Sequence, residues 1–274
     1  MSRHGAHAID VLRRAGAHPA LLPTTALALR ARTVRPASAF FVRERLHRGG
    51  AFAYRLAEAG ISVTIRHGSG DVVTLGEIFH DRQYAPVPEV RPLLREPRRI
   101  VDLGANVGLF GAFAASRWPH AEILAFEPDP ANAAVHERTI LINGLQRRWT
   151  LRRAAAAARD GRASFVAGQV ALSHLAPSGA GEGTVEVATS DVLPLLADAD
   201  LVKMDIEGGE WAILTDPRFR AAPPRVLVLE YHPLQCPEPD PRGAVEAALR
   251  AAELQLRITW SRGDGHGMLW AWRS

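Results

Sequence analysis

The sequence predicts an α/β fold in which a mostly parallel sheet is covered by helices on both faces. Three observations lead to this fold class. From residue 98 onward, short apolar runs alternate with stretches of helical periodicity, as in successive β-α units. The chain of 274 residues is long enough to bury a large core without disulfides, and Cys236 is its single cysteine. Residues 254–272 have the pattern of an antiparallel hairpin around a glycine-rich turn.

Residues 1–97 are expected to form an extension of helices and a β-hairpin in front of the sheet. Residues 1–50 are rich in Ala and Arg and are broken by prolines, which predicts short helices. The alternating pattern of residues 59–65, a glycine-rich turn and residues 72–75 predict the hairpin. A short helix is expected at residues 76–84, and the proline-rich linker that follows it places the domain boundary near residue 97.

The remaining residues, 98–274, are expected to form the main domain. Its parallel strands are predicted at residues 100–103, 123–126, 150–153, 201–204 and 225–229. Helices are predicted at residues 107–118, 130–143 and 242–252. The Gly- and Ser-rich segment 161–190 predicts short strand-like pieces, and the terminal hairpin is placed at residues 254–260 and 268–272.

The composition argues against a nucleic-acid partner and a membrane span. The net charge is +4 and the basic residues are scattered rather than clustered, so they do not form a phosphate-binding stripe. Codon bias toward Arg and Ala in a GC-rich genome explains the high pI more simply. No apolar run is long enough to cross a membrane, and residues 2–16 lack the apolar core of a secretory signal. We therefore expect a cytoplasmic protein, whose oligomeric state is left open, a homodimer included.

The loop after the first predicted strand favours a cationic ligand over a dinucleotide. Gly104 and Gly108 have the spacing G-x-x-x-G, whereas dinucleotide-binding loops have G-x-G-x-x-G. Asn106 occupies the position of the middle glycine, and no Walker A motif follows. The carboxylate of Asp102 at the strand end would repel a phosphate group. A packing role of the glycines alone, without a ligand, is the alternative.

The second predicted strand ends in Glu127-Pro128, and an acid at this place commonly binds a ribose diol. An acidic first loop together with a ribose-binding acid suits a nucleoside with a cationic tail and no phosphate. S-adenosylmethionine has this chemistry, because it carries a ribose, a sulfonium and an ammonium group. The sequence therefore predicts an S-adenosylmethionine site.

The densest polar segment follows the fourth strand and contains Lys203, Asp205 and Glu207. Lys203 is the only lysine of the chain, and a lysine in a buried strand is costly unless it is paired, so we expect it to pair with a carboxylate. An exposed edge lysine is the alternative. The fifth strand ends with Glu230 and His232, which are expected to meet Asp205 in one cleft. There His232 could act as a general base or hold a structural hydrogen bond. The three residues could equally hold a divalent metal, but no ligand spacing supports one, and no metal is assigned.

These segments together resemble the FkbM family of S-adenosylmethionine-dependent methyltransferases. The resemblance is carried by residues 101–108, residues 126–128 with Asn132 and Asn143, residues 201–210, and residues 230–232. Its most specific part is the block Lys-x-Asp-x-Glu-Gly-x-Glu. It covers residues 98–235 well, and residues 1–50 match no known pattern. The resemblance implies a class I methyltransferase (Rossmann-like) fold, a seven-stranded mostly parallel sheet with an antiparallel last strand. It also implies methylation of hydroxyls on sugars of glycans, or on natural products such as polyketides and macrolides.

The sequence and this resemblance together give a set of candidate site residues. Cofactor binding is expected from Asp102, Gly104, Ala105, Asn106, Gly108, Glu127, Pro128 and Asn132. Catalysis is expected from Lys203, Asp205, Glu207 and His232. The acceptor is expected to be a small molecule or a glycan, and residues 171–189, with Ser173 and His174, do not align with the family. A non-catalytic nucleoside-binding module remains the alternative, and an NAD-dependent oxidoreductase is disfavoured by Asn106.

Overall fold

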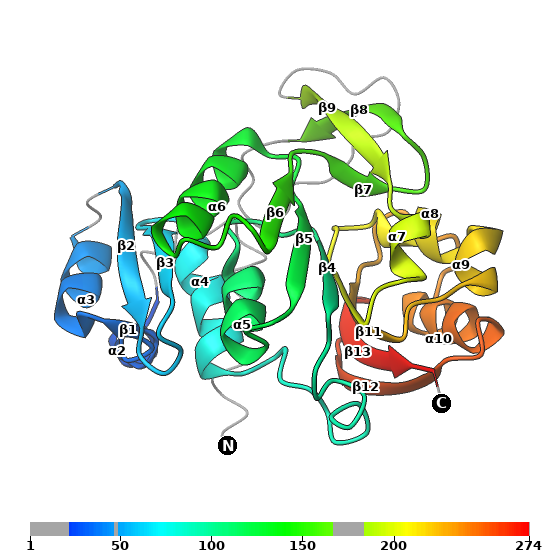
Figure 1. The fold of residues 1–274 in the computed structure, drawn as a ribbon, viewed down its shortest axis with the longest axis horizontal. Helices are drawn as coiled ribbons and strands as arrows, with labels where there is room; N and C mark the ends of the chain where they lie inside the picture. Colours follow the sequence, from blue (N-terminus) through cyan, green and yellow to red (C-terminus); the bar gives the residue numbers. More distant parts are fainter. Residues whose placement is uncertain (1–21, 47–48, 167–183, 274) are drawn as a thin grey trace.

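The computed structural model describes residues 22–46, 49–166 and 184–273. Its centre is a seven-stranded sheet with the strand order β12-β13-β11-β10-β4-β5-β6 (Figure 1). The strands are β4 (Arg99–Leu103), β5 (Glu122–Phe126), β6 (Trp149–Arg152), β10 (Leu201–Met204), β11 (Val226–Tyr231), β12 (Gln255–Ser261) and β13 (Gly267–Trp272). Strands β4, β5, β6, β10 and β11 pair in parallel, and β13 runs antiparallel to both of its neighbours. The predicted class I methyltransferase fold is confirmed.

Helices cover both faces of this sheet, as the buried apolar strands require. Helices α5 (Leu109–Arg117) and α6 (Pro130–Ile142) lie on one face, and α8 (Glu210–Leu214), α9 (Pro217–Ala221) and α10 (Pro241–Ala251) lie on the other (Figure 1). Every residue of β11 is buried. Val226 and Val228 belong to the core on the α5 face, whereas Leu227 and Leu229 belong to the core on the α10 face.

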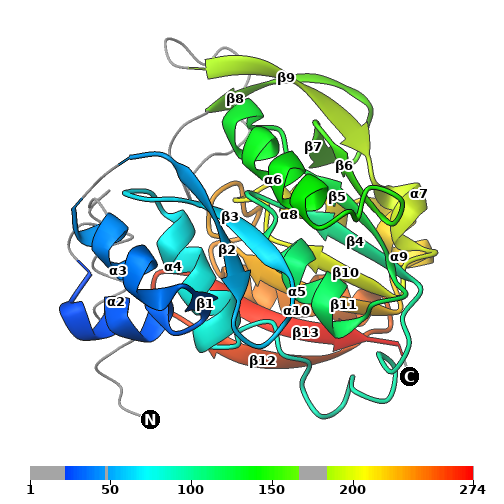
Figure 2. The same ribbon diagram turned by 60° about the vertical axis from the view of Figure 1, so that its left-hand side comes forward.

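The N-terminal extension packs against the α5 face and shares its hydrophobic core (Figure 2). It contains α2 (Thr24–Ala31), α3 (Ala37–Arg45) and an antiparallel sheet of β1 (Val34–Arg35), β2 (Ala51–Leu56) and β3 (Ser62–Arg66). One side chain of α6 and the side chain of its C-cap residue hold β3. Thr139 accepts a hydrogen bond from the backbone N–H of Thr64, and Asn143 bonds to both backbone polar groups of Ser62.

The hairpin of this extension is displaced from its predicted position. The partner of β3 is β2, and residues 72–75, expected as a strand, belong to the helix α4 (Asp71–Leu75). The chain then continues into the π-helix η2 (Gly76–His80). The apolar residues Val72, Leu75 and Ile78 are spaced by three and are all buried, and this helical spacing outweighs the local β-branched composition.

A third sheet, which has three strands, is inserted between β6 and β10. It has the order β7-β9-β8 and consists of β7 (Ala155–Ala157), β8 (Gly161–Val166) and β9 (Thr184–Asp191), followed by the short helix α7 (Leu193–Leu196). Ser173 and His174 lie outside the described residues. Among the helices that the structure describes, none combines the length and the apolar character needed to span a membrane.

Candidate active site

A pocket opens at the carboxyl ends of the central strands, where open parallel sheets bind their ligands. Most of its wall comes from the loop after β4 (residues 104–108, the first loop), the end of β5 and the segment after β10. The N-terminal extension closes one side. The lining residues are Thr74, Glu77, Ile78, Tyr84, Gly104, Ala105, Asn106, Val107, Leu109, Phe110, Glu127, Pro128, Asn132, Ala155, Ala156, Phe165, Lys203, Asp205, Ile206, Glu207, Gly209 and Glu230.

The first loop turns sharply because three of its residues adopt positive φ angles. These angles are 74° at Gly104, 48° at Asn106 and 85° at Gly108. A Cβ atom on Gly104 would lie 1.9 Å from the backbone oxygen of Asp205. The absence of a side chain at Gly104 thus lets the loops after β4 and β10 touch each other, and Gly104 also lines the pocket. Gly108 lies behind the pocket wall, where a Cβ atom would meet the ring of His136 at 2.6 Å.

Glu127 is fixed in the pocket wall by backbone donors. Its carboxylate accepts hydrogen bonds from the N–H groups of Asn106 and Asp129, both at 2.8 Å. Asn132 donates to it at 3.5 Å and is itself bound by Arg66 of the extension, at 2.8 Å. Desolvation raises the pKa of Glu127 to about 7, against the effect of these donors. Glu127 therefore lies where a hydroxyl donor of a ligand would stabilise its ionised form.

Lys203 pairs with a carboxylate, as expected. It lies opposite Asp102 on the neighbouring strand, with Nζ 3.5 Å from Oδ1, and it donates to the backbone oxygens of Gly104 and Leu103 at 2.7 and 3.2 Å. Desolvation raises the pKa of Asp102 to about 6, although Lys203 opposes this shift. Burial by itself would lower the pKa of Lys203, but Asp102 and Asp205 raise it above its ordinary value. Asp102 is fully buried and is not among the lining residues, so it acts on the site through Lys203.

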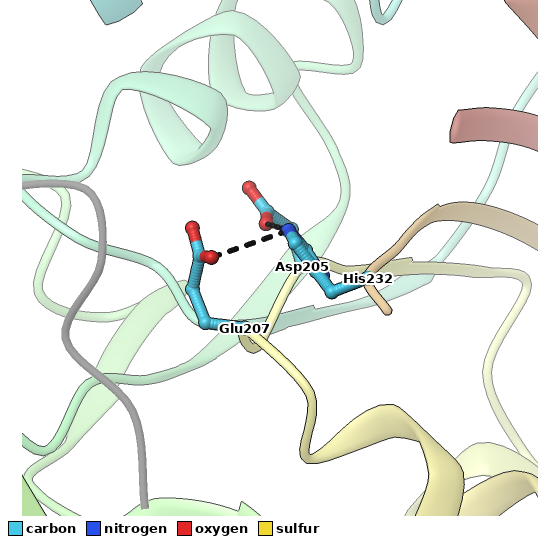
Figure 3. A group of neighbouring side chains, drawn as sticks. All are labelled: Asp205, Glu207 and His232. Carbon is cyan, nitrogen blue, oxygen red and sulfur yellow. Dashed lines mark ion pairs between the residues drawn. The ribbon is translucent and has the colours of Figure 1, made fainter. Parts of the chain in front are cut away.

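A second charged group lies beyond the end of β10, where Asp205, Glu207 and His232 point toward one another (Figure 3). Nε2 of His232 lies 3.3 Å from Oε2 of Glu207 and 3.8 Å from Oδ1 of Asp205. Glu207 has a φ angle of 51°, unusual for a residue with a side chain, and Gly208 follows at 101°. This turn directs the Glu207 side chain toward His232 although β10 already ends at Met204.

The other ring nitrogen of His232, Nδ1, is bound by Glu210 on the side away from Asp205 and Glu207. Glu210 is fully buried and accepts hydrogen bonds from Nδ1 and from the backbone N–H of His232, at 3.0 and 2.7 Å. Desolvation would lower the pKa of His232, but Glu207 and Glu210 outweigh it and raise the pKa to about 10. The surroundings of this ring thus favour a positive charge.

The structure brings most expected site residues together and adds others. Gly104, Ala105, Asn106, Glu127, Pro128, Asn132, Lys203, Asp205 and Glu207 line one pocket, whereas Asp102, Gly108 and His232 lie behind its wall. Glu230, expected beside His232, lines the pocket but is not part of the group around Nε2.

Two residues that the sequence analysis did not single out also belong to the site. Tyr84 of the extension lies with its hydroxyl 3.5 Å from Oδ2 of Asp205. Desolvation and the charge of Asp205 raise the pKa of this hydroxyl well above its ordinary value, so it keeps its proton as a donor. Glu210 accepts hydrogen bonds from His232. It is the last acid of the Lys-x-Asp-x-Glu-Gly-x-Glu block, and its place in this motif could have identified it as a site residue.

The chain also matches a known protein family. The model of the FkbM methyltransferase domain matches residues 102–252. Methyltransferase sdnD of Sordaria araneosa is 42% identical over 67 residues, 24% of this chain and 24% of that protein. Methyltransferase 1 of Beauveria bassiana is 35% identical over 71 residues, 25% of this chain and 26% of that protein. The chain thus spans about a quarter of the length of these curated relatives.

Among solved structures, the chain is similar to the precorrin-6y C5,15-methyltransferase of Geobacter metallireducens. The two chains are 17% identical, with a TM-score of 0.41, over 72% of this chain and 97% of the other.

Proposed function

The chain belongs to the FkbM methyltransferase family, and we propose that it transfers a methyl group from S-adenosylmethionine to a hydroxyl oxygen of a sugar or a natural product, of the glycan, polyketide or macrolide type. One observation carries this proposal. Asp205 follows β10 and Glu127 follows β5, and β4 with its glycine-containing loop lies between these two strands, so the two carboxylates line the pocket on opposite sides of this loop. We call the side of Glu127 the ribose end and the side of Asp205 the acceptor end.

The charge of the pocket supports S-adenosylmethionine as the cofactor. Its wall carries the carboxylates of Glu77, Glu127, Asp205, Glu207 and Glu230, whereas Lys203 is the only positive side chain among the lining residues that the structure describes. Sulfonium and ammonium groups are attracted by such a wall, and the pyrophosphate of a dinucleotide is repelled. The pocket thus favours a methyltransferase over an NAD-dependent oxidoreductase.

The residues of the ribose end hold the cofactor. Glu127 accepts hydrogen bonds from the ribose hydroxyls, and Asn132 and Pro128 complete the wall beside it. The loop of Gly104, Ala105 and Asn106 lies against the cofactor with its main chain. When bound, S-adenosylmethionine supplies an electrophilic methyl group. Asp102 keeps Lys203 in place behind this loop, and Gly108 allows the loop to pass His136.

At the acceptor end, Asp205 orients the acceptor hydroxyl and takes up its proton. Its Oδ2 atom already receives the hydroxyl of Tyr84, which lines the same pocket and is fixed in position by burial. His232, which also pairs with Glu207, keeps this carboxylate in place. The walls exclude water and align the acceptor, which is the main contribution that a protein makes to a displacement of this kind.

We also propose the division into an extension at residues 1–97 and a methyltransferase domain at residues 98–274. The extension supplies Thr74, Glu77, Ile78 and Tyr84 to the pocket wall, so it takes part in the site.

The proposed function is tested by incubation of the protein with labelled S-adenosylmethionine and a panel of hydroxylated sugars, glycolipids and macrolides. The expected products are a methyl ether and S-adenosylhomocysteine in equal amounts, and the control is Asp205→Asn, which should form both about 10²–10⁴ times more slowly. Calorimetry with S-adenosylhomocysteine and with NAD runs in parallel. Binding of NAD without binding of S-adenosylhomocysteine would contradict the proposal.

A further inference from the structure

The group of Asp205, Glu207 and His232 has the composition and size of a metal site. Each residue offers one ligand atom, and these atoms lie within 4.8 Å of one another (Figure 3). We propose that the three side chains bind one divalent cation at the acceptor end of the pocket, where it holds the oxygen of the acceptor hydroxyl. The role toward the acceptor rests on the proposed function, whereas the binding of the cation does not.

The orientation of His232 supports a metal ligand rather than a plain structural histidine. The ring is buried, and its Nδ1 faces Glu210 at 3.0 Å, so this nitrogen is the donor of the pair. Glu210 is in turn fixed by the backbone N–H groups of His232 and Gly208, at 2.7 and 2.8 Å. Nε2 is therefore left to face Glu207 and Asp205. Metal-bound histidines usually donate their other ring N–H to a carboxylate in this way.

The charges around this point also call for a cation. The carboxylates of Asp205 and Glu207 face Nε2, Glu210 lies behind the ring, and Glu230 lines the same pocket. The nearest ammonium, on Lys203, lies 3.5 Å from Asp102 and 3.7 Å from Asp205, so it divides its charge between these two carboxylates. Several carboxylates gathered in a partly buried place repel one another unless a positive charge lies between them.

The ligand set indicates which ions fit and what they can do. Two carboxylate oxygens and one imidazole suit Mn²⁺ and other first-row divalent ions better than Ca²⁺. Three protein ligands leave coordination positions open. Asp205 and Glu207 line the pocket, so a cation held by their carboxylates would be accessible from the pocket. A hydroxyl oxygen bound there would be held beside Asp205.

The proposal is tested with Mn²⁺ alone, by titration of the full chain without cofactor and detection of free Mn²⁺ by electron paramagnetic resonance. We expect one Mn²⁺ per chain. Glu207→Gln and His232→Ala should each weaken binding by about 100-fold or more, and Glu210→Gln by about 10- to 100-fold. The matched control is Glu246→Gln, which removes a carboxylate that pairs with Arg242 and Arg250 on the outer face of α10; it should bind like the wild type.

A spectroscopic readout keeps the test independent of variant stability. Pulsed electron paramagnetic resonance of the wild type should show coupling of Mn²⁺ to an imidazole nitrogen, and His232→Ala, checked for folding by circular dichroism, should lose it. Absence of this coupling, or affinity for Mn²⁺ that survives both ligand substitutions, would overturn the proposal. If Mn²⁺ binds as described but no hydroxyl acceptor is methylated, the proposed function fails and the metal site stands. Full methyl transfer by chelated protein would refute the role toward the acceptor.

Discussion

The two ends of the pocket are built in different ways. At the ribose end, the main chain determines the geometry. The loop at Gly104 and Asn106 turns through positive φ angles, and two backbone N–H groups fix Glu127. At the acceptor end, side chains face one another, and Asp205 lies between Lys203, Tyr84 and His232. The first construction suits the recognition of a constant cofactor, and the second gathers charges that can act on a reacting group. We therefore expect substitutions at the two ends to have separable effects.

The largest expected effect lies at the acceptor end. Asp205→Asn keeps the shape of the side chain but removes the charge that takes up the acceptor proton. Turnover should fall by about 10²–10⁴, the range of a lost general base. The measurement is the rate of methyl transfer at saturating cofactor. A variant with full turnover would show that catalysis consists of alignment alone.

Removal of the buried ammonium group of Lys203 should lower the stability of the fold. Lys203→Met leaves Asp102 buried without its partner, which is expected to cost about 3–5 kcal/mol of unfolding free energy. Because Lys203 lowers the pKa of Asp102, that pKa rises further in the variant. A buried carboxyl with a raised pKa destabilises the fold when it is ionised, so the difference from wild type should be larger at pH 8 than at pH 5.

The control for this experiment is Arg257→Met, which breaks an exposed ion pair with Glu89. Such pairs contribute about 0–1 kcal/mol, so its unfolding curve should stay close to the wild type. Equal unfolding free energies of Lys203→Met and Arg257→Met would show that the buried pair does not hold the strand ends together.

A smaller effect is expected at the ribose end. Glu127→Ala removes the charged group that accepts hydrogen bonds from the two ribose hydroxyls. This loss should reduce the binding free energy of the cofactor by about 1.5–3 kcal/mol. Affinity for S-adenosylhomocysteine, measured by calorimetry, should fall by about 10- to 150-fold. Undiminished affinity in the folded variant would refute the assignment of Glu127 to the ribose.

The pH dependence of cofactor binding sharpens the same assignment. Burial raises the pKa of Glu127 to about 7, and the ribose hydroxyls bind its ionised form. Affinity for S-adenosylhomocysteine should therefore rise with pH between 5.5 and 8, by up to about tenfold per pH unit below 7. Glu127→Gln should flatten this profile. A wild-type profile as flat as that of the variant would mean that the carboxyl keeps one protonation state throughout.

The sequence predicted the central sheet well because its strands are short apolar runs separated by amphipathic helices. The expected strand at residues 201–204 agrees with β10, and that at residues 123–126 with β5. Residues 72–75 were misjudged because their β-branched residues suggest a strand, whereas burial of Val72, Leu75 and Ile78 against the main core selects a helix. Local composition carries no information on that tertiary contact.

The candidate site was predictable where residue type and strand end coincide. Glu127 and Asp205 follow their strands directly, so their place in one pocket could be expected. Three features could not. The buried position of Asp102 depends on its register with Lys203, and Tyr84 reaches Asp205 across 121 positions of the chain. The side chain of Glu207 points toward His232 because the residue adopts a positive φ angle, which no sequence motif predicts.

The central claim, that binding and chemistry lie at opposite ends of one pocket, is tested most directly by calorimetry of S-adenosylhomocysteine with Glu127→Ala and Asp205→Asn in one series. The account predicts that Glu127→Ala loses about 10- to 150-fold in affinity. Asp205→Asn should bind within about twofold of the wild type although it has lost its turnover. Equal losses of affinity in the two variants would contradict the division of the pocket into a ribose end and an acceptor end.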